Sequence, residues 1–252
     1  MDGKVQITAS IVLYKENGDT LQKTIDSFLN TQLTKKLYLI DNSPNDFLKK
    51  YADHPDVNYS FSTANIGFGK AHNTVLENSS NSSEYHLFLN PDVAFKPNVI
   101  PNLMEQLSKD QNVSMISPKV LYPDGELQYT CRKYPRFLDL IIRRLGIFKK
   151  RVYNKEYRDQ DLTKTLYPDF IHGCFLLFKT QDLIDIKGFD ERYFLYMEDA
   201  DICRKIDAAG KKKMYYPQEE IVHIHRKGSN KSIRLFFRHL ISAIKYFNKW
   251  GY

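Results

Sequence analysis

The chain has 252 residues, which is long enough for one large α/β domain or two small ones with a substantial core. We expect no signal peptide and no transmembrane helix, because the chain leads directly into a strand-like segment and no apolar stretch approaches the roughly 20 residues that span a bilayer. The formal net charge of +7 predicts an anionic partner, and nucleic acid, sugar nucleotides and anionic lipid all meet that description.

Strand-like and helix-like segments alternate through the first ninety residues. We predict strands at 5–14, 37–40, 57–61 and 85–89, and helices at 21–29, 47–51 and 66–76. This alternation predicts a parallel, doubly wound sheet whose ligands bind at the carboxyl ends of the strands. Polar residues follow three of these strands, in the order Asp41, Asn65 and Asn90-Pro91-Asp92.

The second half of the chain is less regular. We predict helices at 97–107, 181–186, 198–209 and 232–250, and strands at 115–122, 170–178, 213–216 and 220–225. Segment 131–165 mixes Arg and Lys with aromatic and aliphatic residues, and no structure is predicted for it. The cysteines match neither a metal-site spacing nor a disulfide framework, so we expect buried thiols in a reducing cytoplasm. They are Cys131, Cys174 and Cys203.

The segment from Gly188 to Asp201 contains the strongest candidate for acid–base chemistry. Glu198 and Asp199 directly follow an aromatic run, and carboxylates beside apolar side chains lose solvation, which raises their pKa and favours a general base. The same acidic residues would also stabilise the first turn of a helix through its dipole. We expect both roles.

Three strand-end motifs each allow a structural and a functional interpretation. The Asn90-Pro91-Asp92 tripeptide alone is more typical of a turn, but a carboxylate in that crevice would bind Mg²⁺ or Mn²⁺ on a diphosphate. The glycines between Asn65 and Asn73 lack the spacing of known phosphate loops and also suit the entry to a helix. Asp41 suits either a hydrogen bond to a base or ribose, or a helix N-cap.

The C-terminal part of the chain offers two further candidates. His223 and His225 lie on the same side of a predicted strand and could share a ligand, although a lone histidine is more often structural. The final helix suits either a membrane surface or docking on the protein's own core. Its apolar positions at helical spacing are Ile233, Phe236, Leu240, Ile244 and Phe247, and its basic face holds Arg234, Arg238, Lys245 and Lys249.

Together these segments resemble glycosyltransferase family 2, inverting enzymes with the GT-A fold. That fold is a Rossmann-like, mixed but mainly parallel central sheet flanked by helices. Within the family, the chain is most similar to the bacterial rhamnosyltransferase-like branch that builds surface polysaccharides. The segments that carry the resemblance span nearly the whole chain in the family's order: SIVLYKE, IDNS, NIGFGKAHN, LFLNPDV, GFDERYFLYMEDADICRKI, VHIHRKGSNKS and IKYFNKWG.

The resemblance implies a role for each candidate residue. Asp41 would contact the nucleobase, and the segment containing Asn65, Gly67 and Asn73 would line the donor pocket. Asp92 is at the last position of the family's DXD-like motif and would bind Mg²⁺ or Mn²⁺ on the diphosphate, together with His223.

The motif's first Asp is replaced here by Asn90, which argues against a metal site with two carboxylates. Asp199 matches the general base that deprotonates the acceptor hydroxyl, with Glu198 as its neighbour or substitute.

The resemblance also implies a donor, an acceptor and a location. We expect a single domain, in which 1–92 bind the nucleotide sugar, 93–230 bind the acceptor, and 231–252 form an amphipathic helix. The expected donor is dTDP-L-rhamnose, with a UDP-hexose or UDP-furanose as the alternative. The expected acceptor is a saccharide on polyprenyl diphosphate, which places the protein in the cytoplasm, peripheral to the inner face of the membrane. A basic nucleic-acid-binding protein is a remote alternative, because the basic residues cluster outside the strand-end motifs.

Overall fold

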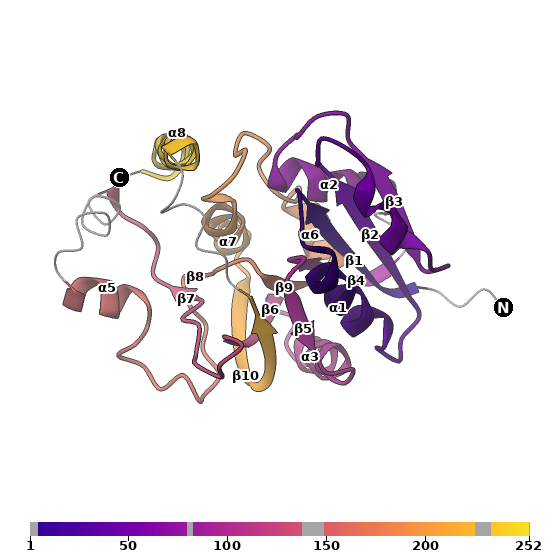
Figure 1. The fold of residues 1–252 in the computed structure, drawn as a ribbon. Helices are drawn as coiled ribbons and strands as arrows, with labels where there is room; N and C mark the ends of the chain where they lie inside the picture. The colour runs from indigo at the N-terminus through magenta and orange to yellow at the C-terminus, as the bar shows by residue number, and fades with distance from the viewer. Residues whose placement is uncertain (1–4, 80–82, 138–148, 225–232, 252) are drawn as a thin grey trace.

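The computed structural model describes residues 5–79, 83–137, 149–224 and 233–251. Its centre is an eight-stranded sheet in the order β3-β2-β1-β4-β9-β6-β10-β5 (Figure 1). The strands of this sheet are β1 (Val5–Leu13), β2 (Lys35–Asp41), β3 (Val57–Phe61), β4 (Ser83–Leu89), β5 (Val93–Phe95), β6 (Val113–Leu121), β9 (Phe175–Lys179) and β10 (Lys212–His223). A separate two-stranded sheet pairs β7 (Cys131–Arg132) with β8 (Phe170–Ile171).

Parallel pairing dominates the first half of the sheet, as the alternation of strands and helices predicts. Strands β3, β2, β1 and β4 are mutually parallel. Strand β9 then runs antiparallel to both β4 and β6, and β5 runs antiparallel to β10. The sheet is therefore mixed and mainly parallel, which confirms the predicted fold class.

Helices cover both faces of this sheet (Figure 1). One face packs against α1 and α3, and the other against α2, α6 and α7, with α8 packed outside α7. The alternation of side chains along the strands explains the two layers: Leu87 and Leu89 belong to the first core, and Phe88 to the second. The helices are α1 (Gly18–Leu29), η1 (Phe47–Ala52), α2 (Phe68–Ser79), α3 (Val99–Ser108), α5 (Lys149–Lys155), α6 (Thr180–Asp185), α7 (Glu198–Ala208) and α8 (Ile233–Trp250).

Three of the predicted strands are wrong in their continuity. The expected single strand at 170–178 is two strands in different sheets, because the chain turns at His172-Gly173-Cys174, where the Cys174 amide donates to the His172 carbonyl. The expected pair at 213–216 and 220–225 is one strand, β10, with a register shift between Tyr216 and Glu220. Pro217 lies in that interval, and a proline cannot donate to the ladder.

The prediction of buried cysteine thiols is confirmed. The cysteines are free and buried. None of the helices that the structure describes has both the length and the apolar character needed to cross a bilayer.

Candidate functional site

Asp92 lies just beyond the carboxyl end of β4 and beside the end of β10. The short strand β5 follows it and pairs Val93 with His223, and the Ile224 amide donates to the Asp92 carbonyl at 3.0 Å. This pairing places the Asp92 Oδ1 atom 3.3 Å from Nε2 of His223, and both side chains are largely buried. The structure thus brings together the two predicted metal ligands, whereas His225 lies outside the described residues.

Gln128 fixes the tautomer of His223. The Gln128 amide nitrogen donates to the carbonyls of His223 (2.6 Å) and Leu121 (3.3 Å), so its Oε1 atom is the one that faces Nδ1 of His223, at 2.9 Å. An oxygen acceptor there requires a proton on Nδ1. The neutral ring therefore presents the lone pair of Nε2 to Asp92, which is the arrangement of a metal-binding histidine and its supporting hydrogen bond.

Two acceptors facing each other at this distance require a proton or a cation between them. Burial lowers the pKa of His223, but interactions with Cys174 and Asp92 outweigh it and raise that pKa to about 10. A carboxylate oxygen and an imidazole nitrogen fit Mn²⁺, and the carboxylate also suits Mg²⁺. The described residues include no cluster of three or more His, Cys, Asp or Glu that could hold a metal, so substrate oxygens and water would complete the shell.

The acidic pair begins helix α7, as predicted, and its two members have different environments. The Asp199 side chain is 18 % exposed, and its Oδ2 atom lies 3.4 Å from Nδ1 of His172. Glu198 is buried, and its Oε2 atom has no hydrogen-bond partner within the described parts of the chain. Burial, followed by the charge of Asp199, raises the pKa of Glu198 to about 8. Asp199 is thus the accessible member of the pair, and burial favours the neutral form of Glu198.

The turn His172-Gly173-Cys174 lies between the acidic pair of α7 and the Asp92–His223 pair. On one side, the Cys174 carbonyl accepts from the Asn90 amide at 2.9 Å, and its thiol interacts with His223. On the other side, His172 contacts Asp199, and a Cβ on Gly173 would lie 3.6 Å from the Cβ of Asp199. Three consecutive residues therefore separate the acidic pair of α7 from the Asp92–His223 pair.

The sequence did not identify His172 or Gln128 as candidates. His172 lies inside a segment that was predicted as one strand, and no pattern marks Gln128, a single amide in an irregular region. Only the fold reveals their contacts.

The predicted donor-side residues lie at the ends of β2 and β3. Asp41 is fully buried and accepts hydrogen bonds from the Ser43 amide and the Tyr59 hydroxyl, each at 2.8 Å. Burial and the neighbouring Asp41 raise the pKa of Tyr59. Asp41 thus stabilises a turn and caps no helix. Asn65 Oδ1 accepts from the Gly67 amide at 3.0 Å, which holds the loop that enters α2.

Gly67 meets a steric requirement at this loop. Its φ is +95°, and a Cβ there would lie 2.8 Å from the Phe194 carbonyl oxygen. The next amide, of Phe68, donates to the same oxygen at 3.0 Å. The glycine segment therefore packs directly against the loop that leads to the acidic pair.

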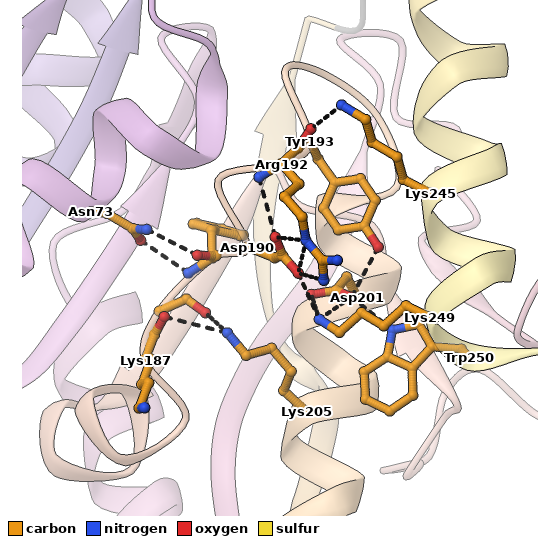
Figure 2. A network of polar contacts seen from close by, with 12 residues as sticks. Asn73, Lys187, Asp190, Arg192, Tyr193, Asp201, Lys205, Lys245, Lys249 and Trp250 are labelled. Carbon is orange, nitrogen blue, oxygen red and sulfur yellow. Dashed lines mark hydrogen bonds and ion pairs between the residues drawn. The ribbon is translucent and has the colours of Figure 1, made fainter.

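Asn73 connects the two halves of the chain (Figure 2). Its amide donates to the Phe189 carbonyl and accepts from the Phe189 amide, both at 2.9 Å. The same nitrogen lies 3.2 Å from Glu191. Both ends of this predicted donor-binding side chain thus bind the segment before α7.

Asp201 is the centre of a buried network that attaches α8 to α7 (Figure 2). It is fully buried and accepts from Lys249 Nζ at 2.8 and 3.0 Å, from Trp250 Nε1 at 2.7 Å and from the Tyr193 hydroxyl at 3.2 Å. Lys249 also pairs with Asp190 at 2.8 Å. These contacts fix the loop that precedes Glu198 and Asp199.

Known proteins resemble this chain in sequence and in fold. The chain is 28 % identical to an N-acetylglucosaminyl-diphospho-decaprenol L-rhamnosyltransferase of Mycobacterium tuberculosis, over 88 % of this chain and 78 % of that protein. It is 25 % identical to the rhamnosyltransferase WbbL of Escherichia coli K12, over 94 % of this chain and 90 % of that protein.

Among solved structures, GalNAc-T7 with UDP, GalNAc and Mn²⁺ superposes with a TM-score of 0.68 at 16 % identity. The match covers 97 % of this chain, which spans about half (48 %) of that one, and it concerns the fold alone. A family model described as glycosyl transferase family 2 matches residues 8–183. The chain belongs to glycosyltransferase family 2, in its rhamnosyltransferase-like branch, and has the GT-A fold.

Proposed function

We propose that this glycosyltransferase is an inverting enzyme that moves L-rhamnose from dTDP-L-rhamnose to a lipid-linked or oligosaccharide acceptor in bacterial surface polysaccharide synthesis. One observation carries the proposal: a three-residue turn separates an accessible carboxylate, Asp199, from the Asp92–His223 pair. A direct displacement needs a base on the acceptor side and positive charge on the leaving-group side. Rhamnose as the sugar is supported by both relatives, which are rhamnosyltransferases, and a lipid-diphosphate acceptor is supported by the Mycobacterium tuberculosis protein, which acts on N-acetylglucosaminyl-diphospho-decaprenol.

Asp199 acts as the general base in this proposal. It takes the proton of the acceptor hydroxyl as that oxygen bonds to the anomeric carbon, and the bond from this carbon to the diphosphate oxygen breaks with inversion. General-base assistance of this kind contributes about 10²–10⁴-fold. His172 orients the Asp199 carboxylate through its Nδ1 atom.

Glu198 is buried, and its raised pKa favours the neutral form, which adds no second negative charge beside the base.

Asp92 and His223 would hold a divalent cation, Mg²⁺ or Mn²⁺, on the donor side, with Gln128 fixing the ring of His223. The positive charge held there would offset the negative charge of the leaving diphosphate. Asn90 lies at the same strand end, where its backbone amide donates a hydrogen bond to the Cys174 carbonyl.

The donor would bind in the half formed by 1–92, with Asp41, Asn65 and Gly67 near the nucleotide and Asn73 holding the pocket wall. The acceptor would bind in 93–230, and 231–252 would face the membrane. An acceptor on polyprenyl diphosphate makes the protein peripheral to the inner face of the membrane.

Transfer assays test the assigned roles. The protein is incubated with Mn²⁺ and dTDP-L-rhamnose, a UDP-hexose or a UDP-furanose, and thermal stabilisation identifies the donor because ligand bound to the native state raises stability. Asp199→Asn and Asp92→Ala should each abolish transfer, whereas Asp53→Asn, at an exposed site beyond η1, should not. Normal turnover in Asp199→Asn would contradict the general-base role. Thermal stabilisation by a UDP-sugar but not by dTDP-L-rhamnose would show that the donor is a UDP-sugar.

A further inference from the structure

Helix α8 exposes its apolar side chains to solvent. Five large apolar side chains of the helix are exposed: Ile233 (76 %), Phe237 (54 %), Ile241 (52 %), Ile244 (48 %) and Leu240 (38 %). At 100° per residue these five positions share one arc of the helix. The opposite arc, which includes Ser242, Ala243 and Tyr246, is buried. A helix that only covered its own core would present polar residues on its outer arc.

The exposed arc has a basic border. Arg234 and Arg238 are four residues apart and lie at its edge. The pKa of Arg238 is lowered by burial and by the charge of Arg234. Arg238 also lies over the Phe194 ring at 3.6 Å. The helix contains no Asp or Glu among its 18 residues. Its charge is therefore complementary to an anionic surface.

We propose that the exposed apolar arc of α8 inserts into the interface of an anionic membrane, with Arg234 and Arg238 among the lipid headgroups. An apolar arc beside a basic border is the pattern of a helix that lies in the plane of a membrane surface. A second copy of the chain is a poorer partner, because α8 offers no carboxylate to the cations of another α8.

This orientation bears on the site and, in that respect only, rests on the proposed function. Ser242 donates to the Leu195 carbonyl at 2.9 Å, and Lys245 donates to the Arg192 carbonyl at 2.6 Å. Helix α8 thus lies against the loop that leads to Asp199, where the acceptor hydroxyl is proposed to bind. Binding of α8 to lipid would hold that side of the enzyme at the surface that carries the acceptor.

Vesicle co-sedimentation of the full chain tests the proposal without sugar donor or acceptor. The wild type should sediment with vesicles of phosphatidylcholine and phosphatidylglycerol in equal parts, less with phosphatidylcholine alone, and less as salt is added. The double variant Ile241→Ser/Ile244→Ser should lose about tenfold or more in vesicle affinity. Phe47→Ser removes a more exposed aromatic side chain (75 %) from η1, away from α8, and should bind like the wild type.

Two controls keep the outcome decisive. Unchanged fluorescence of Trp250, the single tryptophan, shows that α8 of the double variant is still docked. If the double variant misfolds, Arg234→Glu tests the proposal in its place. This substitution is at an exposed position and should weaken binding to anionic vesicles.

Equal binding by wild type and variants, or wild-type dimers that the double variant abolishes, would overturn the proposal. Transfer to a soluble acceptor should persist in the double variant. If the wild type binds vesicles but shows no transfer to the soluble acceptor, only the proposed function is refuted.

Discussion

Replacing Lys249 by Met removes the cation from the buried network around Asp201. Asp201 has no exposed surface, and Lys249 is its charged partner, with a side chain that is 21 % exposed. Removing one partner of a buried ion pair costs about 3–5 kcal/mol. The Tyr193 hydroxyl and the Trp250 indole remain as donors to the carboxylate, so we expect a loss of about 2–3 kcal/mol in the free energy of unfolding.

Urea unfolding at neutral pH measures this loss. The emission of Trp250 reports the docking of α8, because its indole nitrogen binds Asp201 directly, and circular dichroism follows the whole chain. We expect Trp250 to become exposed at lower urea in the variant than in the wild type. The matched control is Lys109→Met, which breaks an i,i+4 pair with Glu105 whose side chains are 57 % and 67 % exposed. That pair contributes about 0.3–0.5 kcal/mol.

The comparison between the two lysines decides the result. If Lys249→Met costs no more than Lys109→Met, the Asp201 network does not hold α8 to the protein. An early change at Trp250 with unchanged global stability would show that the network acts only on local docking.

Three further predictions concern residues near the site. Glu198→Gln should remove a pH dependence: because the folded-state pKa is raised to about 8 from 4.5, the wild type should lose stability relative to the variant as pH rises through that interval, measured by thermal melts at several pH values. Asn73→Leu leaves the amide and carbonyl of Phe189 without their side-chain partner and should cost about 2–4 kcal/mol in urea unfolding; a loss below 0.5 kcal/mol would show that Asn73 is not a structural tie. Gly67→Ala should destabilise the protein by about 1–3 kcal/mol and raise the KM for the donor, because its Cβ would lie 2.8 Å from a backbone oxygen. Gly125→Ala, also at positive φ but with no atom within 4 Å of the added Cβ, should cost less and leave the KM unchanged.

The sequence predicted the features that depend on local pattern. Alternating strands and helices placed Asp41 and Asp92 correctly at strand ends, and the acidic pair correctly at the start of α7. The proximity of Asp199 to His172 depends instead on strand order, since β9 inserts antiparallel between β4 and β6. A buried run such as 170–178 does not show where the chain leaves one sheet for another.

Helical spacing likewise found α8 but assigned its faces incompletely. The stripe predicted from Ile233 to Phe247 mixes residues from both arcs, since Phe247 is buried and Ile244 is exposed. Phe237 and Ile241, absent from that stripe, are exposed. The helix has apolar residues around much of its circumference, so periodicity alone could not decide which arc meets the core; the contacts with α7 decide it.

The His172-Gly173-Cys174 turn sets a fixed internal distance in the enzyme. Its backbone is hydrogen-bonded to Thr130 at one end and to Asn90 at the other, so the separation between Asp199 and the Asp92–His223 pair depends on three residues of one loop. Under the proposed function, changes in other loops would alter which sugar binds and would leave this separation unchanged.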